Sequence, residues 1–172
     1  MADTYISDQM LAAVGSELER RVSYPIAASD IRRWAIAVYY PEEPPRLFWD
    51  EEYAARTRHG GIVAPEDFNP FAWMSAEPAG VPPRRGGHDP NITEKRLGVP
   101  SPGLKFQLNG GMICEYGVRM YPGDVITSVN RLGGYHERDG RLGRMLFTVM
   151  SSTWTNQDGD VVKTLDNTLI RY

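Results

Sequence analysis

Apolar and polar residues alternate along four long runs in the second half of the chain, and this pattern predicts β-strands. The runs cover about residues 111–121, 124–135, 143–155 and 161–171. Turn-forming residues lie between them, at positions 122–123, 138–140 and 156–159. Long consecutive strands joined by tight turns are typical of an antiparallel meander. The pattern therefore predicts a sheet in which strands that follow one another in the sequence are paired.

The first half combines a short strand with helices. Residues 16–24 are a candidate first strand. Ser29 is the expected N-cap of the helix that follows, and Asp30 suits the positive end of its dipole. The apolar residues of this helix recur at helical spacing as Ile31, Trp34, Ala35 and Val38. Asp50 is expected to cap a second short helix, which Gly60-Gly61 ends.

A third helix is predicted around residues 65–77. Either Asn69 caps it with Pro70 in the first helical position, or the helix begins at Pro65 and Pro70 kinks it. The strands present one mostly apolar face, which needs a partner layer, and this helix is the only long element available. The predicted fold class is therefore α+β, with a curved antiparallel sheet wrapped round a central helix.

A long stretch without periodicity follows that helix. Residues 78–104, PAGVPPRRGGHDPNITEKRLGVPSPGL, are rich in Pro and Gly. A loop of this length is often functional, and a mobile insertion is the equally weighted alternative. With 172 residues in all, the chain suits a single domain, 1–172, that includes this loop.

Charge and composition argue against several classes of function. The net charge is −3 with no basic stripe, which argues against nucleic-acid binding. The longest apolar run, about residues 34–40, is too short to span a membrane. Cys114 is the one cysteine, so an internal disulfide is excluded. Since the first residues lack a signal-peptide pattern, we expect a cytoplasmic protein. No cluster has metal-ligand spacing, so neither a metal nor a cofactor is expected.

The order of motifs along residues 15–172 resembles the MaoC-like hydratases and dehydratases. Its first part is carried by Asp30-Ile31, Trp34-Ala35, Asp50, Tyr53-Ala54, Gly61 and Ile62-Val63-Ala64. Its later part is carried by the strand turn YGVRMYPGDVITS and by the tail TNQDGDVVKTLDNTLIRY. The tail is similar to the fatty-acid-synthase-type dehydratase branch of the superfamily. The resemblance implies a single hot-dog fold and the reversible hydration of a trans-2-enoyl thioester.

The catalytic pair of that family has no counterpart here. Family members use an Asp and, five residues later, a His, which share one water and move its protons. Counted back from Asp50, the His position falls on Phe48 and the Asp position on Glu43. Residues 38–58 contain no histidine, so a shift of register does not restore the pair. The family's Ala-His-Gly turn is also changed, to Ala64-Pro65-Glu66. The resemblance therefore assigns no catalytic residue to this chain.

Three residues are alternative candidates for catalysis. Hot-dog thioesterases place a carboxylate on or near the central helix to activate water, and Glu66 and Asp67 stand at the expected start of that helix. The plainer interpretation of both is charge compensation at a helix N-terminus. His88, beside Asp89 in the long loop, is the third candidate, and a solvated loop histidine is the alternative.

Two groups of residues are candidates for substrate binding. Arg84 and Arg85 suit bidentate contacts to the phosphates of coenzyme A, or they serve only to keep the loop soluble. Asn109, Gly110 and Gly111 precede a strand that resembles the family's acyl-facing strand. Glycines there allow a thioester arm to approach the backbone closely, and a β-bulge is the alternative.

Together these features predict a subunit of a heteromeric enoyl-CoA hydratase or 3-hydroxyacyl-thioester dehydratase that lacks the Asp–His pair. Such a subunit supplies acyl-thioester pocket and shared sheet to a hetero-dimer or higher oligomer with an active MaoC-like partner. One alternative is a self-sufficient hot-dog thioesterase or hydratase, for instance a homodimer, that uses Glu66, Asp67 or His88. The other is an acyl-CoA-binding scaffold. In each case the acyl group is expected to be carried by coenzyme A or acyl carrier protein.

Overall fold

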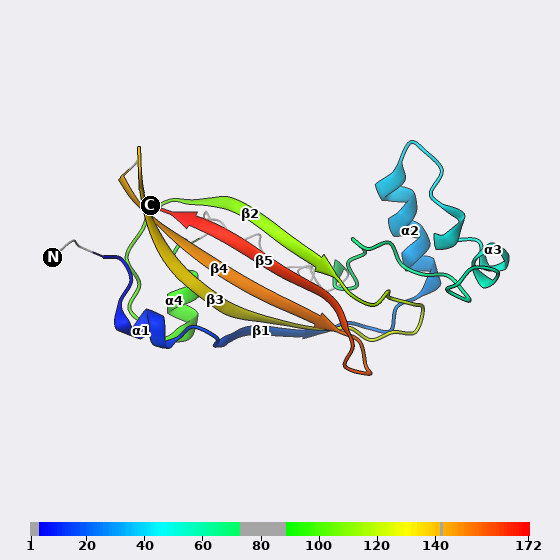
Figure 1. Ribbon diagram of the computed structural model, residues 1–172, viewed down its shortest axis with the longest axis horizontal. Coiled ribbons are helices and arrows are strands. Elements are labelled where there is room, and N and C mark those ends of the chain that lie inside the picture. The colour runs from blue at the N-terminus through cyan, green and yellow to red at the C-terminus, as the bar shows by residue number, and fades with distance from the viewer. Residues whose placement is uncertain (1–3, 73–88, 142) are drawn as a thin grey trace, which may run out of the picture.

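A long, bent antiparallel sheet forms the body of the molecule, and helices gather at both of its ends (Figure 1). The computed structural model describes residues 4–72, 89–141 and 143–172. The five strands are β1 (Glu17–Val22), β2 (Gln107–Tyr116), β3 (Thr127–Gly140), β4 (Gly143–Thr155) and β5 (Val161–Arg171). Strands and helices together confirm the predicted α+β class, and each of the predicted strands has a counterpart within a few residues.

The order of strands in the sheet is β1-β3-β4-β5-β2. The strands β3, β4 and β5 form the predicted meander. The prediction is wrong for β2, which pairs with β5 along the opposite edge and not with its neighbour in sequence, β3. The residues from Gly117 to Ile126 that join β2 to β3 therefore cross the end of the sheet, where Gly123 donates from its backbone to Ile26 at 2.8 Å.

The described chain also contains short helices. They are α1 (Asp8–Ala12), α2 (Ala28–Tyr39), the 3-10 helix η1 (Arg46–Phe48), α3 (Glu51–Ala55) and α4 (Ile92–Leu97). Asp50 caps α3 as predicted, because its side chain accepts from the backbone N–H of Tyr53 at 2.9 Å. Ser29 is not the N-cap of α2. That helix begins at Ala28, after an extended Ala27 that makes no side-chain capping bond.

Two predictions for the middle of the chain need comment. The alternative in which the third helix begins at Pro65 is wrong, because residues 65–69 are not helical, and residues 73–77 lie outside the described residues. Asn69 behaves as the predicted cap, because its side chain accepts from the N–H of Phe71 at 3.0 Å and its carbonyl accepts from the N–H of Ala72 at 3.2 Å. The predicted irregular stretch 78–104 contains α4, which ends at Gly98 in the left-handed conformation (φ 68°).

One face of the sheet, here called the inner face, is covered at both ends. The register places Leu146, Thr148 and Trp154 of β4 on this face beside Arg171 and Lys163 of β5. At one end α4 contacts it through bonds from Arg171 to Glu94, and at the other Phe71 packs edge-on against Trp154 with ring centroids 5.1 Å apart.

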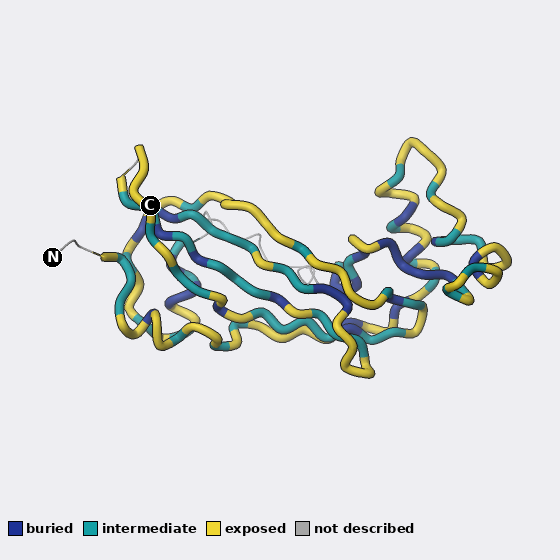
Figure 2. The backbone as a smooth tube through the Cα atoms, in the orientation of Figure 1, coloured by how far each residue is buried: buried dark blue, intermediate teal, exposed yellow. Residues whose placement is uncertain are grey.

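Apart from Leu132, the buried apolar residues fall into two clusters at these two ends (Figure 2). The larger joins α2, η1, α3 and the segment 62–64 to the end of the sheet. The smaller packs α1 and the approach to β2 against β4 through Met10, Leu104 and Leu146. No helix in the described part of the chain is long and apolar enough to cross a membrane.

Candidate functional site

The segment that enters the expected central helix lies against the ends of β2 and β5. Ala64 is buried, and its N–H donates to the carbonyl of Met120 at 2.9 Å. A small cavity of about 10 Å³ remains between Pro65, Glu66, Tyr116 and Arg119. That volume is close to the minimum that holds one water molecule. The described residues alone therefore leave no room for an acyl chain at this place.

Glu66 makes an ion pair with Arg119, with 2.8 Å between Oε1 and Nη1. The Glu66 side chain is more than half exposed, whereas that of Arg119 is only about a quarter exposed. The plainer interpretation of Glu66 was compensation of a helix dipole, but residues 65–68 are not helical. Its charge is balanced by a guanidinium instead.

Asp67 meets Tyr116 and Lys163 at the same end of the sheet. The Tyr116 hydroxyl donates to Asp67 Oδ1, and Lys163 Nζ lies 4.0 Å from that oxygen. The hydrogen bond to Asp67 is the main reason why the pKa of Tyr116 is raised, because ionisation would lose the bond and place two anions together. This cluster brings together an acid, a phenol and an amine, so it can hold or relay a proton.

Lys163 is the least expected member of this cluster, because it is almost fully buried. Its ammonium lies 5.0 Å from the ring centre of Tyr116 and 5.2 Å from that of Trp154, which is the geometry of a cation–π contact with both. Sequence reasoning missed this residue. The signal that was available is a lysine at an inward-facing position of a strand, opposite Trp154 in the register.

The family's Asp–His positions hold no proton-transfer pair. Phe48, at the histidine position, is buried in η1 with its ring centre 6.0 Å from that of Tyr39. Glu43, at the aspartate position, is exposed beyond the end of α2. Two histidines lie within the described residues, and neither replaces the missing one. His59 contacts the Tyr121 hydroxyl at 3.2 Å, and His136 stacks on Phe147 with centroids 4.6 Å apart.

The glycine-containing segment at the start of β2 forms a β-bulge. The register with β5 shifts between Asn109 and Gly111, and Asn109 Oδ1 accepts from the N–H of Gly111 at 2.9 Å. Gly111 has a φ of 117°, a conformation that favours glycine. Asn109, Gly110 and Gly111 are all exposed, so the bulge interpretation accounts for their conformation, and contact with a thioester stays a prediction.

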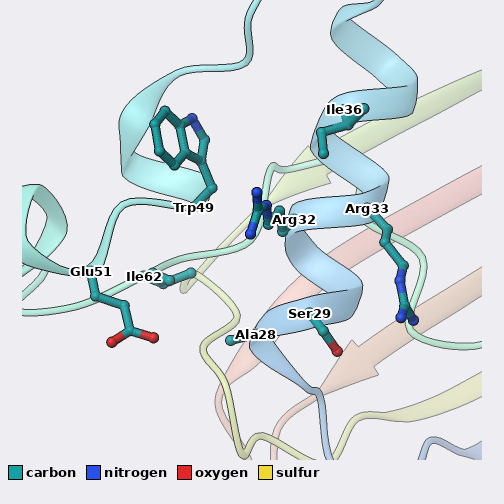
Figure 3. A pocket seen from close by; sticks show the side chains of 8 residues that line it. All are labelled: Ala28, Ser29, Arg32, Arg33, Ile36, Trp49, Glu51 and Ile62. Carbon is teal, nitrogen blue, oxygen red and sulfur yellow. The ribbon is translucent and has the colours of Figure 1, made fainter.

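The remaining predicted site residues, Arg84, Arg85 and His88, lie outside the described residues. Among the residues that are described, no group of three side chains is placed to hold a metal ion. A groove that the sequence did not indicate lies beside α2, between that helix and Trp49, Glu51 and Ile62 (Figure 3).

Comparison with known proteins identifies the class to which this sheet and these helices belong. Three solved structures share the fold, which is the hot-dog fold predicted from the resemblance. The ChsH1-ChsH2 complex from Mycobacterium tuberculosis aligns with a TM-score of 0.63 at 19% identity, covering 91% of this chain and 84% of that one. A MaoC-like dehydratase from Rhodospirillum rubrum gives 0.54 at 20% identity, with 93% and 92% covered. The HadBC (3R-hydroxyacyl-ACP dehydratase) complex from Mycobacterium tuberculosis, truncated at the C terminus, gives 0.54 at 17% identity, with 91% and 99% covered.

The family itself is shown by a match along most of the chain. Residues 12–165 match the FAS1-like dehydratase domain region, and the chain belongs to that family. No curated protein sequence matches it.

Proposed function

We propose that this chain is the subunit without an Asp–His pair in a heteromeric enoyl-CoA hydratase or 3-hydroxyacyl-thioester dehydratase. The observation that carries the proposal is the place of Phe48, which takes the family's histidine position and is buried in the core. A phenyl ring cannot transfer a proton, and Glu43 is exposed five residues earlier. A partner subunit that carries the Asp and the His then transfers protons to and from the enoyl thioester.

The outer edge of β2 supports pairing with such a partner. β2 is the last strand in the sheet order, and an edge strand is a ready template for another chain. Large apolar side chains are exposed along it, namely Leu108 at 51%, Met112 at 63% and Ile113 at 70%. Two of the similar structures are complexes, ChsH1-ChsH2 and HadBC. We place the partner along this edge, so that the two sheets become continuous.

A turnover assay tests the proposal. Hydration of crotonyl-CoA is measured with the purified chain alone and after co-expression with a MaoC-like subunit that carries the Asp–His pair. We expect activity only in the pair. Ile113→Lys should prevent co-purification, since it places a charge in the apolar contact, whereas Val22→Lys on the opposite edge strand β1 should not. Hydration by the chain alone would contradict the proposal, and coenzyme A binding without turnover in either preparation would favour a scaffold.

The second candidate function is a thioesterase that acts without a partner. The observation in its favour is the convergence of Asp67, Tyr116 and Lys163, in which Asp67 can accept a proton from water. Its test is hydrolysis of short acyl-CoA esters by the chain alone, compared with Asp67→Asn and Glu66→Gln. Loss of hydrolysis in Asp67→Asn alone would favour this function, and hydrolysis unchanged by both substitutions would reject it. The phosphate contacts of Arg84 and Arg85 stay a proposal for either function.

A further inference from the structure

The groove beside α2 has the size of a ligand site. It has a volume of about 410 Å³ and lies between Ala28, Arg32 and Ile36 on one side and Trp49 on the other (Figure 3). A second hollow of about 350 Å³ shares three of its lining residues, Ala28, Glu51 and Ile62, and continues toward Pro122. Small-molecule sites typically enclose a few hundred Å³. Its lining contains no histidine or cysteine, so the groove suits binding and not proton-transfer chemistry.

Two neighbouring arginines of the groove differ in a way that points to an anion. Figure 3 shows the Arg32 guanidinium directed into the gap toward Trp49, whereas Arg33 is turned away from it. Arg33 makes an ion pair with Asp30, with 3.4 Å between Nη1 and Oδ1. Arg32 makes no ion pair with any described residue. Glu51, the acid of the groove, points away from Arg32 in the same view. A guanidinium without a carboxylate partner is suited to a phosphate group.

The opposite wall is an aromatic ring held in one orientation. Trp49 donates its indole N–H to the carbonyl of Pro44 at 3.0 Å, and no other aromatic ring of the described residues packs on it. Ile36, across the gap, is 48% exposed, and Ile62 lies at the floor between them. A fixed indole beside apolar side chains provides a surface on which a flat ring can stack.

We propose that this groove binds an adenine nucleotide, with the flat base against Trp49 and a phosphate on Arg32. The nucleotide end of coenzyme A is one source of this chemistry, and that source rests on the function proposed above; a free nucleotide is the other. Neither Phe48 nor the Asp67 cluster lines the groove, so we assign to it the positioning of a ligand and no proton transfer.

Calorimetric titration of the intact chain with coenzyme A and with ADP tests this site. Arg32→Gln should weaken binding of both ligands by about tenfold, the effect of losing a charged hydrogen bond. Arg56→Gln is the matched control and should stay within about twofold, because Arg56 lies outside the lining of both hollows and makes an exposed ion pair with Glu52. Trp49→Leu should also weaken binding. Neither substitution of an exposed arginine is expected to change the melting temperature.

The outcomes separate this site from the proposed function. If coenzyme A binds more tightly than ADP, the ligand of the groove is the nucleotide end of the coenzyme A that carries the acyl group. If the two bind equally, the ligand is a free nucleotide. No binding, or equal losses in Arg32→Gln and Arg56→Gln, would overturn the site even if the chain pairs with an active subunit. Conversely, nucleotide binding that depends on Arg32 in a chain that forms no pair would leave the site standing and reject the proposed function.

Discussion

Arg171 and Glu94 form a two-point ion pair that is hidden from solvent, although 77 positions separate them in the sequence. Nη1 lies 2.7 Å from Oε2 and Nη2 lies 2.8 Å from Oε1. Arg171 also donates to Thr148 and to the carbonyl of Pro90, and the Tyr135 hydroxyl donates to Glu94. These bonds hold the six-residue helix α4 on the inner face of the sheet.

Removing the acid of this pair should destabilise the protein strongly. Glu94→Gln leaves the Arg171 guanidinium buried without its counter-charge, which typically costs about 3–5 kcal/mol of unfolding free energy. Urea unfolding followed by circular dichroism measures the loss. Lys95→Gln is the control, because it breaks the exposed pair with Asp89 and should cost less than about 1 kcal/mol. A loss in Glu94→Gln no larger than in the control would contradict this account.

The same pair should make stability depend on pH in the acid range. Burial alone would raise the pKa of Glu94, but the bonds from Arg171 and Tyr135 outweigh it and hold the pKa below its ordinary value of 4.5. A carboxyl with a depressed pKa in the folded state adds stability above its unfolded pKa and loses it as the pH falls through the folded pKa. Unfolding free energy should therefore fall on acidification below about 4.5, and Glu94→Gln should flatten that slope.

The bond between Tyr116 and Asp67 predicts a change in tyrosine titration. Asp67→Asn should lower the pKa of Tyr116 toward its ordinary value of 10.0, since the carboxylate is the main cause of the rise. Ultraviolet absorbance of tyrosinate during alkaline titration detects the change, with Tyr116→Phe to identify the signal. Glu66→Gln should leave it unaltered, because Glu66 pairs with Arg119. An identical titration in Asp67→Asn and the parent chain would show that the bond does not form in solution.

Close packing at Gly117 predicts a steric effect. A Cβ at this position would lie 2.0 Å from the carbonyl oxygen of Val161. That carbonyl cannot move aside easily, because it accepts from the N–H of Val118 at 2.9 Å. Gly117→Ala should cost at least about 1–3 kcal/mol, the usual effect of overpacking. Gly134→Ala is the matched control, since a Cβ there would have no heavy atom within 4 Å. Similar melting temperatures for the two variants would contradict the packing described.

Lys163 should stabilise the sheet end through its aromatic neighbours. Lys163→Met keeps most of the apolar stem and removes the charge between Tyr116 and Trp154. The expected loss is about 1–2 kcal/mol of unfolding free energy, since the ammonium is largely desolvated. Lys105→Met provides an exposed comparison and should be close to neutral. A more stable Lys163→Met protein would mean that the cost of burying the charge exceeds the cation–π attraction.

The sequence by itself determined the features that depend on neighbouring residues. Alternation and turn residues placed β4 and β5 nearly to the residue, because side-chain direction in a strand repeats every second position. Asp50 was recognised as a helix cap because its capping bond reaches only three positions along the chain. The missing histidine was also evident from the sequence, and the structure adds that Phe48 is buried.

Tertiary structure alone decided the features that depend on distant residues. The pairing of β2 with β5 arises from a register that no local pattern encodes. α4 forms in a segment without helical periodicity, because a helix of six residues gains its stability from packing and from the bonds of Glu94 to Arg171. The Asp67–Tyr116 bond and the groove between Arg32 and Trp49 likewise join residues whose proximity follows only from the folded chain.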